Sequence, residues 1–131
     1  MKRVIIESPF RPGVPKERPE YRQILRRHVQ YARLAMLDSL RRGEAPFISH
    51  LLYTQVWSED PEFREAGIRA GSEYLRVSET LAIYQALGVT DGMRVRIDLA
   101  EMNGIPIEYR SLGVSAEALD AMPFTAFAEL A

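Results

Sequence analysis

Short runs rich in β-branched residues alternate with longer helical patterns along this chain of 131 residues. The first run, Arg3 to Glu7, is nearly continuous in apolar residues, which is typical of a parallel strand covered on both faces. Because strands and helices keep alternating along the chain, the order predicts an α/β layer fold with a mostly parallel sheet.

Local signals mark where each element begins and ends. Pro61 fits the first position of a helix that Asp60 caps, and Gly43 and Gly104 follow the last turns of two other helices. Pro106 favours an edge position for the last strand. We predict, in chain order, a strand at 3–7, a loop at 8–15, a helix at 19–42, a strand at 45–49 running on to 55, a helix from 60, a strand at 80–84, a helix at 93–103, a strand at 105–109 and a weak helix after 115 that Pro123 interrupts.

The length predicts one domain over residues 1–131. Its last part, about 112–131, carries Phe124, Phe127 and Leu130, which are too apolar for a free tail. We expect this segment to dock on the core or on a second subunit. A purely structural dimer module is therefore one hypothesis for the chain.

Composition narrows the function classes. The chain has no cysteine and only two histidines, so we expect no metal and no cofactor. No apolar run approaches the ~20 residues of a membrane span, and we expect a soluble cytoplasmic protein. Residues 1–46 carry 11 Lys or Arg against 5 Asp or Glu, but most of this excess lies on one predicted helix face. Nucleic-acid binding is therefore not the favoured interpretation.

Three loops follow the predicted strands, at 8–15, 49–57 and 87–93. Ligands of open parallel sheets bind outside the carboxyl ends of the strands, so these loops are candidate binding segments. In the third loop, Thr90 or Asp91 caps a helix whose first turn contains Gly92. Its free backbone N–H groups suit a phosphate or carboxylate, although the same pattern also describes an ordinary capped helix.

Arg96 lies on the inward side of this predicted helix, opposite Arg94, Asp98 and Glu101. An inward arginine needs an anionic partner or a wet cleft. Two interpretations stay open: an ion pair with Glu7 or Glu79 at a neighbouring strand end, or a grip on a ligand phosphate.

Other candidates are ambiguous as well. His50 is either a packed or capping histidine or a hydrogen-bond donor to a sugar or phosphate. Tyr53 and Trp57 either stack on a base or belong to the core. Glu7 is either catalytic or a helix-capping carboxylate, and His28 is interpreted as structural.

Three segments resemble the nucleoside 2-deoxyribosyltransferase-like superfamily, and more closely its small bacterial and phage members. They are Val-Ile-Ile-Glu-Ser-Pro-Phe at 4–10, Ala-Pro-Phe-Ile-Ser-His-Leu-Leu-Tyr-Thr-Gln at 45–55, and the block from Thr90 to Tyr109. The resemblance covers roughly residues 1–110. It implies a flavodoxin-like, Rossmann-like doubly wound domain with a sheet of four to five strands and helices on both faces. Such domains usually form dimers, and characterised members cleave or exchange the N-glycosidic bond of deoxynucleosides or nucleoside monophosphates.

The resemblance also assigns roles to single positions. It places Ser8, Pro9 and Phe10 in the loop that contacts base and sugar. It places Thr90 and Gly92, next to Met93, at a ligand 5′-phosphate. The nucleophilic glutamate of the superfamily falls four residues after that glycine, where this chain has Arg96.

This departure separates two hypotheses. Glycosidic cleavage passes through an oxocarbenium-like state, which a guanidinium repels and a carboxylate stabilises. Either Glu7, Glu79 or Asp91 has taken the catalytic role, or the cleft binds a nucleotide without cutting it. We favour the binding protein, with a nucleoside monophosphate-like ligand held by Arg96 and the Thr90–Gly92 turn, in a homodimer or higher homo-oligomer.

Overall fold

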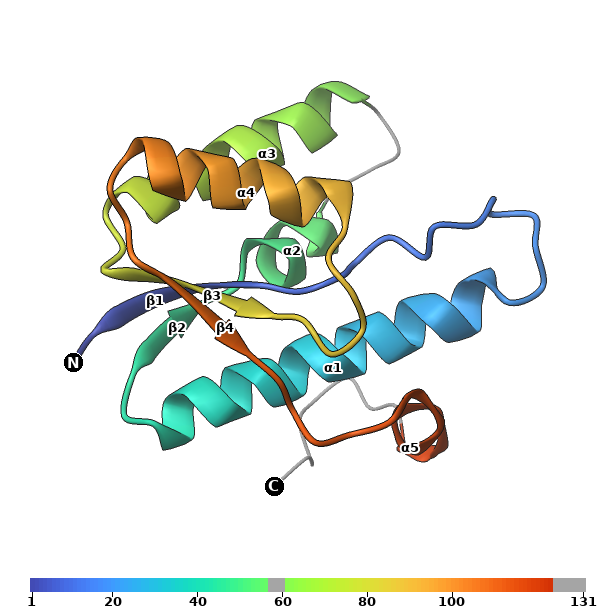
Figure 1. Cartoon of the computed structure of the whole chain (residues 1–131). Coiled ribbons are helices and arrows are strands. Elements are labelled where there is room, and N and C mark those ends of the chain that lie inside the picture. Colours follow the sequence, from blue (N-terminus) through green and yellow to red (C-terminus); the bar gives the residue numbers. More distant parts are fainter. Residues whose placement is uncertain (57–60, 124–131) are drawn as a thin grey trace.

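The computed structural model describes residues 1–56 and 61–123 and has the predicted alternation of strands and helices (Figure 1). The strands are β1 (Arg3–Glu7), β2 (Ala45–Phe47), β3 (Thr80–Tyr84) and β4 (Ile107–Arg110). The helices are α1 (Tyr21–Arg41), α2 (Ser49–Leu52), α3 (Pro61–Arg76), α4 (Asp91–Met102) and α5 (Ala116–Ala121), and a 3₁₀ turn, η1, spans Tyr53–Gln55.

The four strands form one parallel sheet in the order β2-β1-β3-β4. Ile5 pairs with Phe47 on one side and Leu81 on the other, which puts β1 in the middle of the sheet. The predicted α/β class and the flavodoxin-like, Rossmann-like arrangement are therefore confirmed. Strand β4 lies at an edge, as Pro106 indicated, because a proline cannot donate to a second neighbouring strand.

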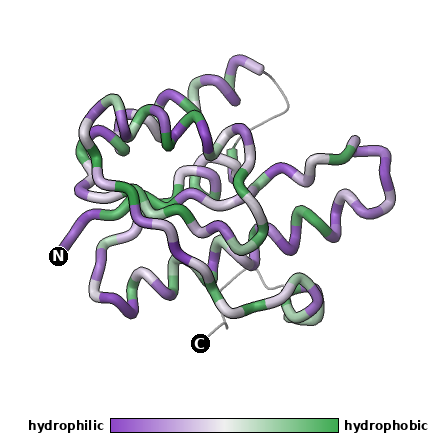
Figure 2. Tube along the Cα trace, viewed as in Figure 1, coloured by the Kyte–Doolittle hydropathy of each residue, from purple (hydrophilic) through white to green (hydrophobic). Residues whose placement is uncertain are grey.

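Helices cover both faces of the sheet. In Figure 1, α1 and α5 lie on one face and α3 and α4 on the other. Period-2 alternation explains the two cores: Val4 and Ile6 face Tyr31 of α1, whereas Ile5 shares a cluster with Leu75 of α3. Figure 2 shows the most hydrophobic stretches gathered on the strands at the centre.

The chain leaves β1 toward α1 on one face and leaves β3 toward α4 on the other (Figure 1). The carboxyl ends of these two neighbouring strands therefore lie at the topological switch point, where open α/β sheets bind their ligands. Glu7, the last residue of β1, pairs with Ile83 of β3 at this place.

The predicted second strand was wrong beyond Phe47. Ile48 is still extended, but Ser49 to Leu52 form α2 and the 3₁₀ turn follows at once. In this apolar run, Leu51 packs against the core cluster on the α1 side and Tyr53 against Phe47, whereas Leu52 between them is 48% exposed. The first helix begins at Tyr21, since residues 15–20 form turns in which Arg18 N donates to Pro15 O.

An ion-pair network fixes β4 beneath α1. Arg110 is 5% exposed and donates both Nη atoms to Glu44, at 2.8 and 2.7 Å, and Nη1 also to Tyr84 Oη at 3.1 Å. Burial opposes the charge of Arg110, but its hydrogen bonds outweigh that effect and raise its pKa. The network joins the edge strand to the start of β2 across the α1 face of the sheet.

The structure describes residues 112–123 of the C-terminal segment that we predicted to dock on the core or on a second subunit. Ser115 caps α5 by accepting from Ala118 N, and Leu119 is 1% exposed in the core cluster that includes Tyr31 of α1. The prediction for Phe124, Phe127 and Leu130 falls outside the described residues.

Candidate functional site

Four polar side chains meet at the carboxyl end of β1: Glu7, Ser8, His50 and Arg96, which we call the strand-tip site. Glu7 is the last residue of β1 and Ser8 follows it, His50 comes from α2 and Arg96 from α4. Ser8 Oγ and His50 Nε2 share a hydrogen bond of 2.9 Å. The structure therefore brings together residues from all three segments that carry the family resemblance, 4–10, 45–55 and 90–109.

Glu7 and Arg96 form a buried pair. Their side chains are 10% and 6% exposed, and Arg96 Nη1 lies 3.7 Å from Glu7 Oε2. The other terminal nitrogen, Nη2, donates to Ile68 O of α3 at 3.0 Å. Glu7 Oε2 and Arg96 Nη1 have no hydrogen-bond partner among the described residues. The pair thus presents one unused acceptor and one unused donor side by side.

Burial dominates the electrostatics of the site. It raises the pKa of Glu7 to about 7, and the neighbouring Arg96 cation offsets only part of this effect. Burial also lowers the pKa of His50 to about 4, and the positive Arg96 and His28 act in the same direction. Near neutral pH, His50 is therefore uncharged, and the Glu7 carboxyl is present in both its protonated and its ionised form.

Phe10 closes the site from the loop side. Its ring meets His50 edge-on, with centroids 6.1 Å apart, and its carbonyl accepts from His28 Nδ1 of α1 at 2.9 Å. Burial is the main cause of the lowered pKa of His28. His28 therefore holds the loop in place through the Phe10 carbonyl, which fits the structural role predicted for it. Pro9, the residue before Phe10, is fully buried.

The N-terminus of α4 lies on the same edge of the sheet. Thr90 Oγ1 accepts from Met93 N at 3.2 Å, and Met93 Sδ accepts from Thr90 N at 3.4 Å. The first intrahelical bond runs from Arg94 N to Thr90 O, so Asp91 N and Gly92 N precede it. Met93 is 1% exposed and belongs to the core, whereas Asp91 and Gly92 before it are exposed.

Arg96 is buried, as its helical position predicted, but it does not serve the Thr90–Gly92 turn. Its hydrogen bond goes to Ile68 O and its ion pair to Glu7. A direct grip of Arg96 on a phosphate at this turn, which the sequence left open, does not fit this geometry. The guanidinium belongs to the strand-tip site.

Other predicted residues lie elsewhere. Glu79 precedes β3, so it lies at the amino ends of the parallel strands, away from the strand-tip site. There its side chain is 46% exposed and accepts a hydrogen bond from Arg3 Nε at 3.1 Å. It is neither a partner of Arg96 nor a catalytic candidate at this site. Asp91 is exposed at the start of α4, and Tyr53 packs edge-on against Phe47. Trp57 lies outside the described residues.

Sequence reasoning missed two contributions of α3: the carbonyl of Ile68 and the close approach of Gly71 to Arg96. Only Gly71 left a signal, because a glycine inside a helical pattern often marks a close contact. The contact of Ile68 could not be found from its side chain, since the backbone supplies it.

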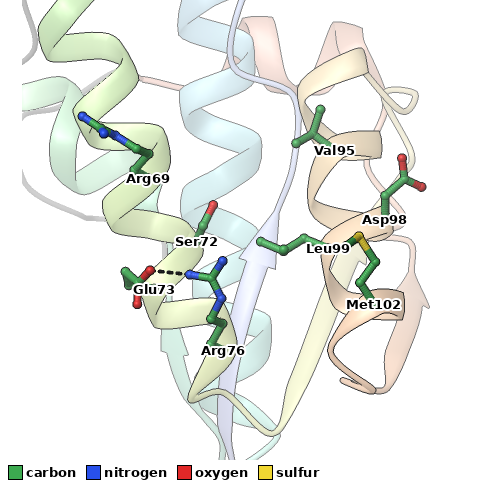
Figure 3. A pocket seen from close by; sticks show the side chains of 8 residues that line it. All are labelled: Arg69, Ser72, Glu73, Arg76, Val95, Asp98, Leu99 and Met102. Atoms are coloured by element: carbon green, nitrogen blue, oxygen red, sulfur yellow. Dashed lines mark hydrogen bonds and ion pairs between the residues drawn. The ribbon is translucent and has the colours of Figure 1, made fainter.

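A separate groove of about 490 Å³ runs between the outer faces of α3 and α4 (Figure 3). Figure 3 shows Val95 and Leu99 pointing from α4 toward α3, and Glu73 paired with Arg76 on the α3 side. None of the eight lining residues belongs to the strand-tip site. Across residues 1–56 and 61–123, no three His, Asp or Glu side chains converge to hold a metal ion.

The family comparison matches residues 2–110 to a family model described as a domain of unknown function, DUF7768. The chain belongs to this family. The DUF7768 match runs to the last residue of β4, so it contains the strand-tip site and the α4 turn but ends before α5. No curated protein and no solved structure matched the chain. None of the helices in the described part of the chain combines the length and apolarity needed to span a bilayer.

Proposed function

We propose that this protein binds a nucleoside monophosphate or a closely similar nucleotide at the strand-tip site and releases it unchanged. The observation that carries the proposal is the incompletely bonded Glu7–Arg96 pair. An unused carboxylate oxygen and an unused guanidinium nitrogen lie 3.7 Å apart. One ligand hydroxyl can donate to the first and accept from the second, which satisfies two buried groups that are otherwise costly.

The neighbouring side chains suit a sugar as well. Ser8 and His50 add a hydroxyl and an uncharged imidazole at the same strand end. Because the Glu7–Arg96 atoms are closed to solvent, a ligand reaches them only after neighbouring side chains move. The Phe10 ring, which rests on His50, is the residue of the 8–15 loop best placed to do so.

A phosphate then fits the N-terminus of α4. Asp91 N and Gly92 N are available there, and the helix dipole favours an anion. Asp91 precedes Arg96 by five residues, about 7.5 Å along the helix axis. This spacing is compatible with a sugar at the strand tip and its phosphate at the turn.

Thermal stability tests this assignment. We expect a nucleoside monophosphate to raise Tm and the matching nucleoside to raise it less, because only the first carries the phosphate. At a ligand concentration 100 times Kd the stabilisation amounts to about 2.7 kcal/mol. The E79Q variant, altered at the amino ends of the strands, should respond like the wild type. An equal response to nucleotide and nucleoside, or none to either, contradicts the proposal.

A second candidate function is N-glycosidic cleavage with Glu7 as a relocated carboxylate. The supporting observation is that Glu7 Oε2 lies beside Arg96, the position that the resemblance aligns with the nucleophilic glutamate. In such a reaction the C–N bond breaks, the base leaves with its electron pair and takes a proton, and water completes the sugar. The adjacent guanidinium disfavours the positive charge that develops on the sugar, so we rank this function second.

Product analysis separates the two functions. After incubation with a panel of nucleoside monophosphates, we expect chromatography to detect no free base above the enzyme-free control. Release of base by the wild type that is lost in E7Q but kept in E79Q establishes the cleavage function instead. The E79Q variant is the matched control because it removes a carboxylate of the same size from the other end of the sheet.

A further inference from the structure

We infer that Gly71 of α3 is the positioning residue of the strand-tip site, because the space left by its missing Cβ holds the guanidinium of Arg96. A Cβ at this position would lie 2.4 Å from Arg96 Nη2 and 2.9 Å from Nη1. It would also lie 2.9 Å from Ser49 Cβ of α2. Atoms this close overlap, so any residue other than glycine must displace the guanidinium of Arg96 and also widen the contact with Ser49.

The backbone of α3 also holds the guanidinium of Arg96, and we call Gly71 and Ile68 O together the guanidinium seat. Ile68 O, three residues before Gly71, accepts from Arg96 Nη2 at 3.0 Å. The guanidinium is rigid and planar, so fixing Nη2 against α3 also sets the direction of Nη1. Nη1 then faces Glu7 Oε2 at 3.7 Å. A carbonyl and a missing side chain on one helix therefore aim the cation that Glu7 meets.

Glycine has no reason of its own to occupy this position. It is buried inside a helix of 16 residues, and glycine is the least favourable helix residue after proline. Alanine would therefore stabilise the helix if space were the same. The close contact with Arg96 reverses this expectation.

The guanidinium seat influences the pKa of Glu7, because it fixes the distance between Arg96 and the carboxyl. A Cβ on residue 71 displaces the end of the flexible Arg96 side chain more easily than Cβ of Ser49. The guanidinium then moves away from Glu7, and the carboxyl loses the one nearby cation that lowers its pKa. The proton affinity of Glu7 thus depends on a residue that does not touch it. For the ligand this inference rests on the proposed function, whereas for the proton it stands alone.

The experiment compares G71A with G113A, a control at a glycine outside the strand-tip site, where an added Cβ would meet no atom within 4 Å. We measure Tm and the titration of the Glu7 carboxyl by ¹³C NMR, with E7Q identifying the resonance. We expect G71A to lower Tm and to raise the pKa of Glu7 by about 1, as the loss of a nearby cation predicts. G113A should leave the pKa of Glu7 unchanged and should not lower Tm.

The R96A background shows whether Gly71 acts through Arg96. R96A alone should raise the pKa of Glu7, and adding G71A should then raise it no further and lower Tm much less than in the wild type. If G71A alone fails to fold, the double variant should recover most of the loss, because the two closest contacts of the added Cβ are with the guanidinium and only the contact with Ser49 Cβ remains.

Two results overturn the inference: G71A with the stability and Glu7 titration of the wild type, or a loss of Tm from G71A that is equally large in the R96A background. The titration needs no ligand, so its outcome does not depend on the proposed function. If no member of a panel of nucleoside monophosphates binds the wild type while the titrations behave as expected, the proposed function fails and the role of Gly71 stands. If a nucleotide binds both the wild type and G71A with equal affinity, the role of Gly71 in ligand positioning fails.

Discussion

Replacing Glu7 with glutamine should make the protein more stable at pH 8 and leave its stability near pH 4.5 almost unchanged. The ordinary pKa of this carboxyl is 4.5, and burial raises it to about 7 in the folded protein. Between these values the folded chain holds a proton that the unfolded chain has lost. Stability therefore falls as pH rises through this window, by about 3 kcal/mol from this one group. Glutamine stays neutral and removes the fall.

His50 should show the opposite dependence. Its pKa drops from 6.5 to about 4 on folding, so the unfolded chain takes up a proton that the folded chain does not. Its contribution to stability is complete above pH 6.5 and is lost as pH falls toward 4, by up to about 3 kcal/mol. Between pH 4.5 and 6.5 the effects of Glu7 and His50 cancel in the wild type.

Urea unfolding from pH 4.5 to pH 8 measures both effects. We expect E7Q to gain stability with rising pH relative to the wild type, and H50Q to lose it. The E79Q variant is the control, because Glu79 is exposed and its hydrogen bond with Arg3 lowers its pKa, whereas burial raises that of Glu7. A stability curve for E7Q that runs parallel to that of the wild type would show that Glu7 is not protonated in this window.

The R110A substitution is expected to cost about 3–5 kcal/mol, the usual cost of breaking a buried ion pair by removing one partner. Glu44 would stay buried without the two short hydrogen bonds of 2.8 and 2.7 Å that keep its pKa low. Tyr84 Oη would also lose a donor at 3.1 Å. Because Arg110 ends β4, the edge strand should loosen first.

Equilibrium unfolding of R110A and R3A checks this expectation. Arg3 also pairs with a glutamate, but its side chain is 65% exposed, and such pairs contribute less than about 1 kcal/mol. The double variant R110M/E44Q removes both charges and keeps the volumes close, so it should recover much of the loss. If R110A costs no more than R3A, the network does not hold the edge strand.

Much of the architecture follows from local sequence. β1 and β3 have the predicted bounds because their residues form continuous apolar runs, and the Thr90 cap of α4 follows from its side-chain chemistry. The inward direction of Arg96 follows from helical periodicity alone. The segment after Phe47 did not follow, because an apolar stretch as short as Leu51 to Tyr53 suits a helix turn as well as a strand.

The site itself was only partly predictable. Glu7 ends a strand and Glu79 precedes one, and in a parallel sheet these positions lie at opposite ends of the strands. The sequence was therefore sufficient to exclude Glu79 from the site that contains Glu7. The contact between Ser8 and His50 needed the path of α2, which no local pattern fixed.

What the sequence determined by itself is the set of elements and the face each residue takes within its own element, because both depend on neighbours along the chain. The tertiary structure alone decided that Arg96 meets Glu7, Ile68 O and the gap at Gly71. These contacts join residues up to 89 positions apart, from 7 to 96, and depend on how α3 and α4 pack over β1. Backbone carbonyls and missing side chains take part in them, and neither leaves a periodic signal in the sequence.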